Sequence, residues 1–467
     1  MSLAEKGETP IFEKKTGHVR FQWLVSLMVN LPVLTYGIQA GWVSPMAPVL
    51  QSEASPLGRA ISSTELAWIA SALFLGAAVS PPVYSYVADK FGRKVACMLV
   101  SIPQIITWIM TLFANSVTTL IAARVLSGMA AGGAFCVTPM FVKEISEDQV
   151  RGATGSLGMV IQSVGFLIIY AMGAFMEYHM IIYSVLVIPF LHMVLSVFFI
   201  PESPSFLVKT DKIQDAKKNI AWLRGLKIED KKVENAVEKI KQEIASNSMI
   251  QKVSVKSVVT HKPSRKGLII SVVLHGVRGM GGSLVILSYA SVLLDRSNVS
   301  VNKLVQTMTI PAIMIVGIAI SLIIVDKIGR KPLLIMGYGV MGLSLLALGV
   351  VSHVGSQSPQ WSWVPITALM AATFGYGIGV LSIPYIIMAE IFNVHVRATI
   401  LGYIAVYIWL VVFINVQTFG YIMESFGIFT ACYIYAGVNL LGVVYSVFCL
   451  PETKGRSIDE IEKKLVK

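Results

Sequence analysis

The chain is poor in charge and in cysteine for its length. Only 14% of its 467 residues are charged, against about 25% in a typical soluble protein. Hydrophobic residues make up 55% of the chain, with a mean hydropathy of +0.71, too apolar to be hidden in one water-soluble core. We therefore expect apolar side chains to face lipid. The cysteines lie in apolar segments without paired spacing, which argues against a disulfide framework or a metal site: Cys97, Cys136, Cys432 and Cys449.

Signatures of catalysis are also missing. The sequence has no phosphate-binding loop, nucleophile motif or metal-ligand cluster, so neither an enzyme nor a cofactor is expected. The net charge of +12 could indicate nucleic acid binding in a soluble protein. In a membrane protein Lys and Arg collect in the cytoplasmic loops, and this second reading is the better one. A small solute and the lipid bilayer are the expected partners, with no nucleic acid.

Long apolar runs predict an all-α membrane protein with twelve transmembrane helices. A helix needs about 20 mostly apolar residues to cross a bilayer. The runs form two sets of six, separated by a polar stretch. They lie near 21–43, 66–88, 96–115, 118–142, 152–176 and 180–200, and near 267–294, 304–326, 332–352, 362–389, 398–421 and 426–450.

These runs divide the chain into a tail (1–20), a first six-helix bundle (21–200), a linker (201–266), a second bundle (267–450) and a C-terminal tail (451–467). From Lys209 to Lys266 the linker holds fifteen Lys or Arg and seven Asp or Glu. Its apolar residues at 233, 237, 240 and 244 recur at helical spacing, which indicates short amphipathic helices; a disordered basic linker is the alternative. Basic residues cluster in alternate loops, so both tails are predicted to be cytoplasmic.

Three charged motifs occur twice, in the same order and 237 to 250 positions apart, which indicates an internal duplication. Parallel six-helix repeats are typical of transporters whose halves rock about a central site. The paired motifs are Asp89–Lys94 with Asp326–Lys331, Glu144 and Arg151 with Glu390 and Arg397, and Pro201–Pro204 with Pro451–Gly455.

The repeated charges are candidates for a gating network at the cytoplasmic mouth. Acids and arginines there could pair when the halves close and separate when they open. The alternative for the basic residues is topology alone, but acids contribute little to orientation. The predicted network comprises Asp89, Arg93, Arg124, Glu144, Arg151, Glu202, Asp326, Arg330, Glu390, Arg397 and Glu452.

Together, these motifs resemble the sugar porter family of the major facilitator superfamily, and most of all its insect facilitated trehalose transporters. The resemblance covers nearly the whole chain. It implies two six-helix bundles, a sugar site at the middle of the membrane, and alternating access without chemistry on the solute. The implied function is facilitative uniport of a sugar such as trehalose or a hexose across the plasma membrane. A non-transporting sensor with the same fold is a further alternative.

The resemblance also implies site residues, and some of them depart from the family. Gln162 matches the family's sugar-binding glutamine, and Tyr289 and Trp409 match positions that line its cavity. Helix 7 of the family carries a glutamine pair, a glycine and an asparagine. The departures from family residues are Arg278-Gly279, Leu284, Tyr385 and Ile408, while Gly282 keeps the glycine. Several hydrogen-bonding partners for a sugar are therefore missing, which weakens the sugar assignment.

Arg278 is the sharpest departure, because it falls near the middle of helix 7. A lipid-facing arginine there costs at least about 3 kcal/mol, so we expect it to face the central cavity within reach of Gln162. His275 lies three positions earlier, on nearly the same face. Nearby glycines indicate a broken or closely packed helix. Arg278 is either a site for an anionic solute or an internal residue that fixes helix 7.

Two further features concern coupling and topology. Proton-driven members of this family need an ionisable group within a helix, and no Asp or Glu lies at the middle of a predicted span. Passive uniport is therefore predicted, with His275 leaving proton sensitivity open. Asn298-Val-Ser300 is the only N-glycosylation sequon, and we expect it in the outer loop between helices 7 and 8.

Overall fold

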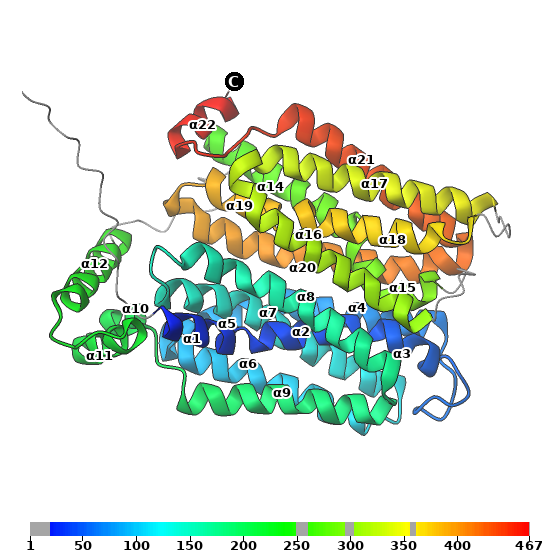
Figure 1. Ribbon diagram of the computed structural model, residues 1–467, viewed down its shortest axis with the longest axis horizontal. Helices are drawn as coiled ribbons and strands as arrows, with labels where there is room; N and C mark the ends of the chain where they lie inside the picture. Colours follow the sequence, from blue (N-terminus) through cyan, green and yellow to red (C-terminus); the bar gives the residue numbers. More distant parts are fainter. Residues whose placement is uncertain (1–18, 249–259, 295–302, 355–360, 467) are drawn as a thin grey trace, which may run out of the picture.

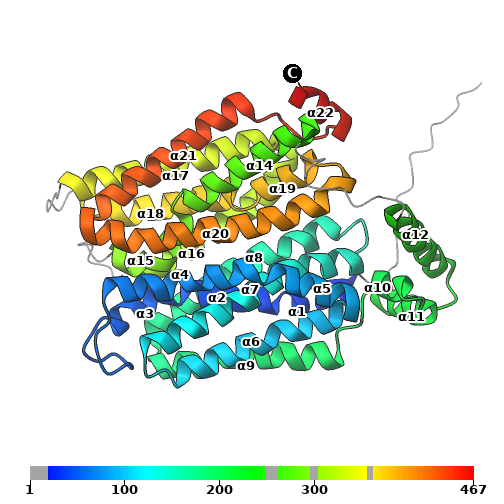
Figure 2. The same cartoon turned by 180° about the vertical axis from the view of Figure 1, so that it is seen from behind.

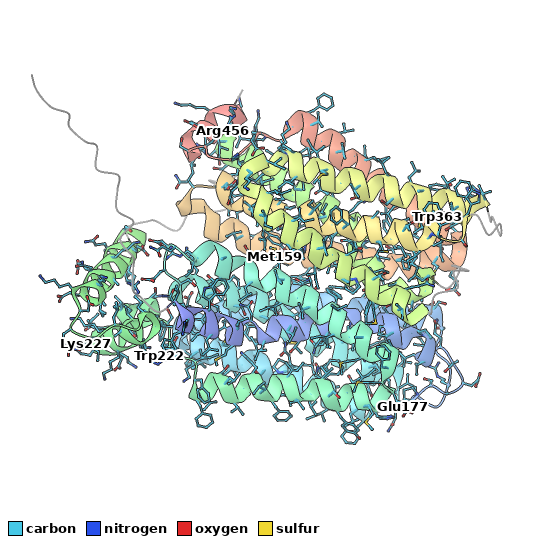
Figure 3. The ribbon with its side chains drawn as sticks, viewed as in Figure 1. Met159, Glu177, Trp222, Lys227, Trp363 and Arg456 are labelled. Carbon is cyan, nitrogen blue, oxygen red and sulfur yellow. The ribbon has the colours of Figure 1, made fainter. Side chains whose placement is uncertain are left out.

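The computed structural model describes residues 19–248, 260–294, 303–354 and 361–466. Its helices form two bundles packed side by side, one from each half of the chain (Figures 1 and 2). Three short helices, α10 to α12, lie at one end of the first bundle. We call this end of the molecule the linker end and the opposite one the far end. Figure 3 shows Trp222 and Lys227 at the linker end and Glu177 and Trp363 at the far end.

The first bundle contains nine helical segments, because two of its six spans are interrupted. Asn30 interrupts the first span just before Pro32, and Ser80 separates α4 from α5, which are bent by 42°. Proline cannot donate the helical hydrogen bond, so breaks at these places are expected. The segments are α1 (Arg20–Val29), α2 (Leu31–Gly41), α3 (Val43–Leu50), α4 (Ser63–Val79), α5 (Pro81–Phe91), α6 (Arg93–Leu112), α7 (Val117–Ile145), α8 (Arg151–Phe175) and α9 (Tyr178–Phe198).

The second bundle also has six spans with two interrupted, but here the interrupted spans are the first and the fourth. Helix 7 is broken between α14 and α15, where Gly282 has a φ of +87° that favours glycine. The fourth span of the half passes through a π-helical turn, η2. The segments are α14 (Lys262–Met280), α15 (Ser283–Leu294), α16 (Lys303–Ile328), α17 (Arg330–Val354), α18 (Val364–Gly375), η2 (Tyr376–Val380), α19 (Ile383–Ile391), α20 (Val394–Phe426) and α21 (Ile428–Cys449).

All twelve predicted apolar runs coincide with helical spans in the described part of the chain. Eleven are long and apolar enough to cross a membrane, and the bent α4–α5 pair makes a twelfth if it is counted as one span. The first span is longer than expected, because α3 extends it to Leu50. The predicted all-α membrane fold is confirmed.

The linker is helical over its described residues: α10 (Pro204–Lys209), α11 (Ile213–Arg224) and α12 (Lys231–Ser248). Val233 and Val237 are buried against α10 and α11, as the apolar spacing indicated. Three ion pairs connect these helices to the first bundle: Lys239 Nζ lies 2.8 Å from Asp148 Oδ2, Arg224 Nε 3.3 Å from Glu147 Oε1, and Lys209 Nζ 3.9 Å from Asp89 Oδ1. At the same end, α22 (Ile458–Val466) packs against α14.

Small residues allow α2 and α8 to pack closely beside the centre of the molecule. A Cβ on Gly37 would lie 2.1 Å from the carbonyl oxygen of Gln162, and one on Gly165 would lie 2.4 Å from that of Leu34. Neither position has room for a larger residue. Close backbone approach of this kind is how helices associate in membranes, and here it fixes the height and rotation of the helix turn that carries Gln162.

Candidate solute site and charged clusters

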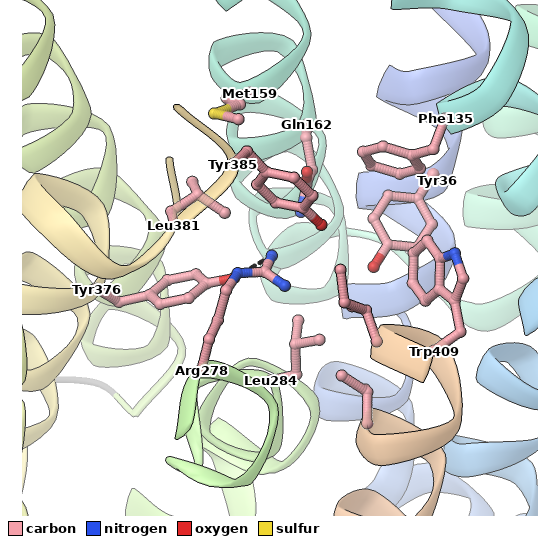
Figure 4. Close-up of a pocket in the computed structure, with 12 residues that line it drawn as sticks. Tyr36, Phe135, Met159, Gln162, Arg278, Leu284, Tyr376, Leu381, Tyr385 and Trp409 are labelled. Atoms are coloured by element: carbon pink, nitrogen blue, oxygen red, sulfur yellow. Dashed lines mark hydrogen bonds between the residues drawn. The ribbon is translucent and has the colours of Figure 1, made fainter. Parts of the chain in front are cut away.

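A small cavity lies between the two bundles, near the middle of the spans. Its volume is about 30 Å³, room for about two water molecules and too little for a sugar. Both halves therefore have to move apart before a larger solute can enter. The lining residues are Tyr36, Phe135, Met159, Gln162, Arg278, Leu284, Tyr376, Leu381, Tyr385, Ile408, Trp409 and Val412 (Figure 4).

Aromatic rings form one side of the cavity. Tyr36 of α2 packs edge-on against Phe135 of α7, with ring centroids 5.0 Å apart. Trp409 of α20 comes from the other half and contacts both, at 5.8 Å from Tyr36 and 5.5 Å from Phe135. Such a surface suits the apolar face of a ring, and the side chain of Gln162 adds an amide with donors and an acceptor beside it.

Arg278 forms the opposite side, near the C-terminal end of α14. Its Nη2 donates a hydrogen bond of 3.3 Å to the hydroxyl of Tyr376. Its guanidinium carbon lies 5.1 Å from the ring centroid of Tyr385 and 5.9 Å from that of Tyr376. Figure 4 shows the guanidinium pointing into the space between these rings, Gln162 and Tyr36. Arg278 and Gln162 both line this cavity, and their role in binding the solute stays a prediction.

Local structure explains this placement of Arg278. α14 stops at Met280, and its last carbonyl groups accept hydrogen bonds from other helices: Asn415 Nδ2 donates to Gly279 O at 2.7 Å and Asn439 Nδ2 to Gly281 O at 2.9 Å. A helix C-terminus carries partial negative charge and stabilises a cation there by about 0.3–1 kcal/mol. The π-helical turn η2, a kind of distortion frequent at functional sites, presents Tyr376 to the arginine.

The charge of Arg278 is nonetheless incompletely matched. Arg278 is 8% exposed, and its Nε has no hydrogen-bond partner. Among the described residues, no Asp or Glu lines the cavity or pairs with it. Two cation–π contacts contribute about 2 kcal/mol each in a desolvated site, whereas burying an ion costs several kcal/mol. The site can therefore receive a further acceptor, and an anionic one best of all.

The structure places the other predicted binding residues differently. Tyr385 and Trp409 line the cavity with Gln162 and Arg278, but His275, Gly282 and Tyr289 do not. His275 is fully buried behind the cavity wall, with its ring 4.7 Å from that of Tyr385. Gly282 faces Tyr435, and Tyr289 lies at a kink in α15, packed on Phe419 at 4.9 Å. These three residues lie outside the lining of the cavity in this state, and their role in binding the solute stays a prediction.

Several lining residues were not predicted. Tyr36 and Tyr376 belong to glycine-rich stretches, Tyr36-Gly-Ile-Gln-Ala-Gly41 and Gly375-Tyr-Gly-Ile-Gly379, and that composition is the one signal that could have found them. Phe135, Met159, Leu381 and Val412 stand among many apolar residues that face lipid or neighbouring helices. Leu284 and Ile408, noted for departing from the family's asparagines, do line the cavity and make it less polar.

The two bundles are joined at the far end. The backbone N–H of Ser291 in α15 donates to Ser44 Oγ in α3 at 3.1 Å, and Ser291 Oγ donates to the carbonyl oxygen of Ser44. Nearer the centre, Tyr170 of α8 donates its hydroxyl hydrogen to the carbonyl oxygen of Leu287. The cavity is therefore closed toward the far end.

At the linker end the repeated charges form two equivalent clusters, one in each half. In the first half, Arg93 Nη2 lies 3.0 Å from Glu144 Oε1 and its Nη1 lies 3.3 Å from Asp89 Oδ1. The second half has the same set: Arg330 lies 2.9 Å from Glu390 and 3.1 Å from Asp326. Among the described side chains, no ion pair connects the halves. In this state, which is closed toward the far end, the two clusters are separate; a network shared by both halves stays a prediction for the state that is closed at the linker end.

Glu202 and Glu452 complete these clusters through the backbone. Glu202 accepts from the N–H of Arg93 at 2.9 Å, and Glu452 accepts from that of Arg330 at 3.0 Å. Gly92 and Gly329, with φ values of +105° and +106°, turn the chain beside each carboxylate, and a Cβ on Gly92 would lie 2.1 Å from Glu202 Oε2. The duplication is thus retained at the level of single hydrogen bonds.

The two carboxyl groups differ in their surroundings. Burial raises the pKa of Glu202 above its usual value, in spite of its backbone hydrogen bonds. Glu452 is less buried; the effect of burial is outweighed by the N–H donors of Lys454, Arg330, Lys331 and Thr453, and its pKa is lowered.

Two predicted members of the network, Arg124 and Arg151, lie elsewhere. Arg124 belongs to neither cluster: its Nε and Nη1 donate to the carbonyl oxygens of Ile69 (3.0 Å) and Gln39 (2.6 Å) inside the first bundle. Arg151 pairs with Asp148 at 2.5 Å, beside the linker. Arg397 lies in α20, with its side chain outside the described part of the structure, and Asn298 lies outside the described residues altogether.

Comparison with known proteins agrees with this architecture. The chain is 25% identical to a facilitated trehalose transporter of Bombyx mori, over 97% of this chain and 89% of that one. It is 27% identical to a facilitated glucose transporter, member 8 of solute carrier family 2, of Mus musculus, over 96% of this chain and 95% of that one. An inward-open structure of the E. coli xylose transporter superposes with a TM-score of 0.79 at 20% identity, over 95% and 99% of the two chains.

The family described as sugar (and other) transporter matches residues 57–465, which include both charged clusters and eleven of the twelve cavity-lining residues. Its members carry solutes and are not enzymes. The chain therefore belongs to the sugar transporter family of the major facilitator superfamily.

Proposed function

We propose that this protein is a facilitative carrier that moves a sugar, with trehalose and hexoses as the first candidates, through the cavity between its two bundles. The cavity carries the proposal, because its lining comes from both halves and no lining residue has a carboxyl group. The relatives are named as transporters of trehalose and glucose, and we therefore propose a sugar as the solute. The bundles at 21–200 and 267–450 act as the two rocking units. When the cavity opens at the far end it closes at the linker end, and the reverse.

The linker end is proposed to be cytoplasmic, and the plasma membrane to be the site of action. Lys90, Lys94, Lys331 and the linker helices α10 to α12 lie at this end, which agrees with the positive-inside rule. Asn298 would then be extracellular. Labelling of a cysteine placed at position 298 by an impermeant reagent added outside intact cells supports this orientation, and labelling solely from the cytoplasm contradicts it.

Uptake into proteoliposomes tests the function. Labelled trehalose and glucose are expected to equilibrate without accumulating, and an imposed pH gradient should have no effect. Gln162→Ala should lower uptake at least tenfold, whereas Ser156→Ala on the same helix, away from the cavity, should leave it unchanged. Saturable binding with no uptake of any solute would indicate a sensor. Accumulation driven by a pH gradient would contradict uniport.

A further inference from the structure

We infer that the cavity selects solutes of sugar size that carry one carboxylate, such as a hexuronate, over neutral sugars. This inference rests on the proposed function, because it takes the cavity as the transport site. It narrows the solute class from sugars in general to sugar acids, and it assigns Arg278 as the residue that binds the carboxylate.

The first observation is the unused donor capacity of Arg278. A guanidinium has five N–H donors and no acceptor. The described contacts supply one hydrogen bond, to the hydroxyl of Tyr376, and the Nε is buried without a partner. The side chain points into the cavity (Figure 4). A carboxylate matches the fork of a guanidinium with two parallel hydrogen bonds, which a sugar hydroxyl cannot do.

A second buried arginine in the same protein shows what a structural role looks like. Arg124 is 4% exposed, and its Nε and Nη1 both donate to backbone carbonyl groups. It also lies over the ring of Trp42, at 5.9 Å. Arg124 holds helices together with its hydrogen bonds. Arg278 instead has aromatic neighbours and an unpaired nitrogen beside the cavity.

The rest of the cavity suits the remainder of such a solute. Tyr36, Phe135 and Trp409 offer ring faces and edges opposite the guanidinium, and the Gln162 amide lies between the two sides. Apolar Leu284 and Ile408 leave few partners for the hydroxyl groups of a neutral sugar. The lining has one positive charge and, among its described residues, no acid. A solute with a single negative charge balances it, so a carboxylate is favoured over a phosphate dianion.

The test is uptake of D-glucuronate and D-glucose by the purified full chain in proteoliposomes. D-Glucuronate should have the higher ratio of maximal rate to half-saturation, by at least tenfold. Because a uniported anion carries charge, an inside-positive potential should make D-glucuronate accumulate and leave the distribution of D-glucose unchanged. Equal or better transport of D-glucose would overturn the inference while leaving the proposed carrier function intact.

Variants separate binding from folding. Arg278→Gln should lose the preference for D-glucuronate by at least tenfold, and Arg278→Lys should keep part of it. D-Glucuronate should raise the thermal stability of the unmodified protein in detergent but not that of Arg278→Gln. Arg124→Gln is the matched control: it should lower the yield of folded protein without changing selectivity. An Arg278→Gln protein that folds and keeps its preference contradicts the inference. Failure of folded, unmodified protein to transport either solute overturns the proposed function, and the inference with it.

Discussion

Ser44 and Ser291 join the two halves of the protein at the far end, through two hydrogen bonds between α3 and α15. In the proposed cycle these bonds must break each time the cavity opens on that side. Each is worth about 1 kcal/mol, so the contact is weak enough to break and reform.

Replacing both serines by cysteine should therefore allow the far end to be locked. Oxidation of Ser44→Cys/Ser291→Cys should abolish uptake, and a reductant should restore it, because the cavity then opens toward the linker end alone. Transport assays with each single cysteine variant as control measure this. Full transport by a completely cross-linked protein would show that the halves do not separate here.

Close packing of α2 on α8 should make Gly165 intolerant of a side chain. Gly165→Ala places a Cβ 2.4 Å from the carbonyl oxygen of Leu34, and overpacking of this kind costs about 1–3 kcal/mol. It should also shift Gln162 and lower uptake. Gly155→Ala on the same helix is the matched control: nothing lies within 4 Å, and alanine should stabilise the helix by up to about 1 kcal/mol. Thermal unfolding in detergent compares the two; equal melting temperatures would contradict the packing argument.

Glu202 and Glu452 should respond to pH in opposite directions. The pKa of Glu202 is raised above its usual 4.5, so its contribution to stability is greatest below pH 4.5 and is lost as the pH rises through the folded-state value. The pKa of Glu452 is lowered, so its contribution is present above pH 4.5 and is lost as the pH falls.

Neutral glutamine variants measure this difference. At pH 7, Glu452→Gln should lower the melting temperature more than Glu202→Gln does, and the gap should narrow toward pH 4. Both variants keep an oxygen that can accept the backbone hydrogen bonds of the turn. If the melting temperatures of the two variants change with pH in the same way, the difference in burial does not alter the pKa values of the two carboxyl groups.

Polar residues restored to the cavity should improve the handling of neutral sugars. Leu284→Asn and Ile408→Asn each place an amide on the lining, where the family carries asparagine. Each new hydrogen bond to a hydroxyl group contributes about 0.5–1.5 kcal/mol, or roughly a twofold to tenfold gain in affinity for glucose. Competition between glucose and trehalose for uptake measures the change. Val411→Asn, next to the cavity but outside its lining, is the control, and an equal gain there would argue against a specific site.

Most of the fold could be predicted from the sequence because lipid imposes one requirement on every span, a run of about 20 apolar residues. The duplicated motifs then indicated two bundles. The helical linker followed from the spacing of Val233 and Val237, which are buried as expected. The first span extends to Leu50, beyond the predicted run at 21–43, because α3 continues it and accommodates Pro45 and Pro48.

Residues of the site were harder to identify, since hydropathy does not give the rotation of a helix within a bundle. Arg278 could be placed because charge is excluded from lipid, and Gln162 because a motif marked it. Phe135 carries no such mark; a phenylalanine suits lipid, a helix interface or a cavity equally well. Arg124 lies outside both charged clusters because two backbone carbonyl oxygens accept its hydrogen bonds, and a sequence motif gives no sign of backbone partners.

The duplicated charged clusters have a further consequence. Each half contains its own arginine, its own acids and its own backbone turn, so none of these contacts depends on the other half. The linker helices add their described ion pairs to the first half. A chain severed between α12 and α14 would therefore leave both local networks whole. Two half-length polypeptides would each keep the arginine, the acids and the turn that make up one cluster.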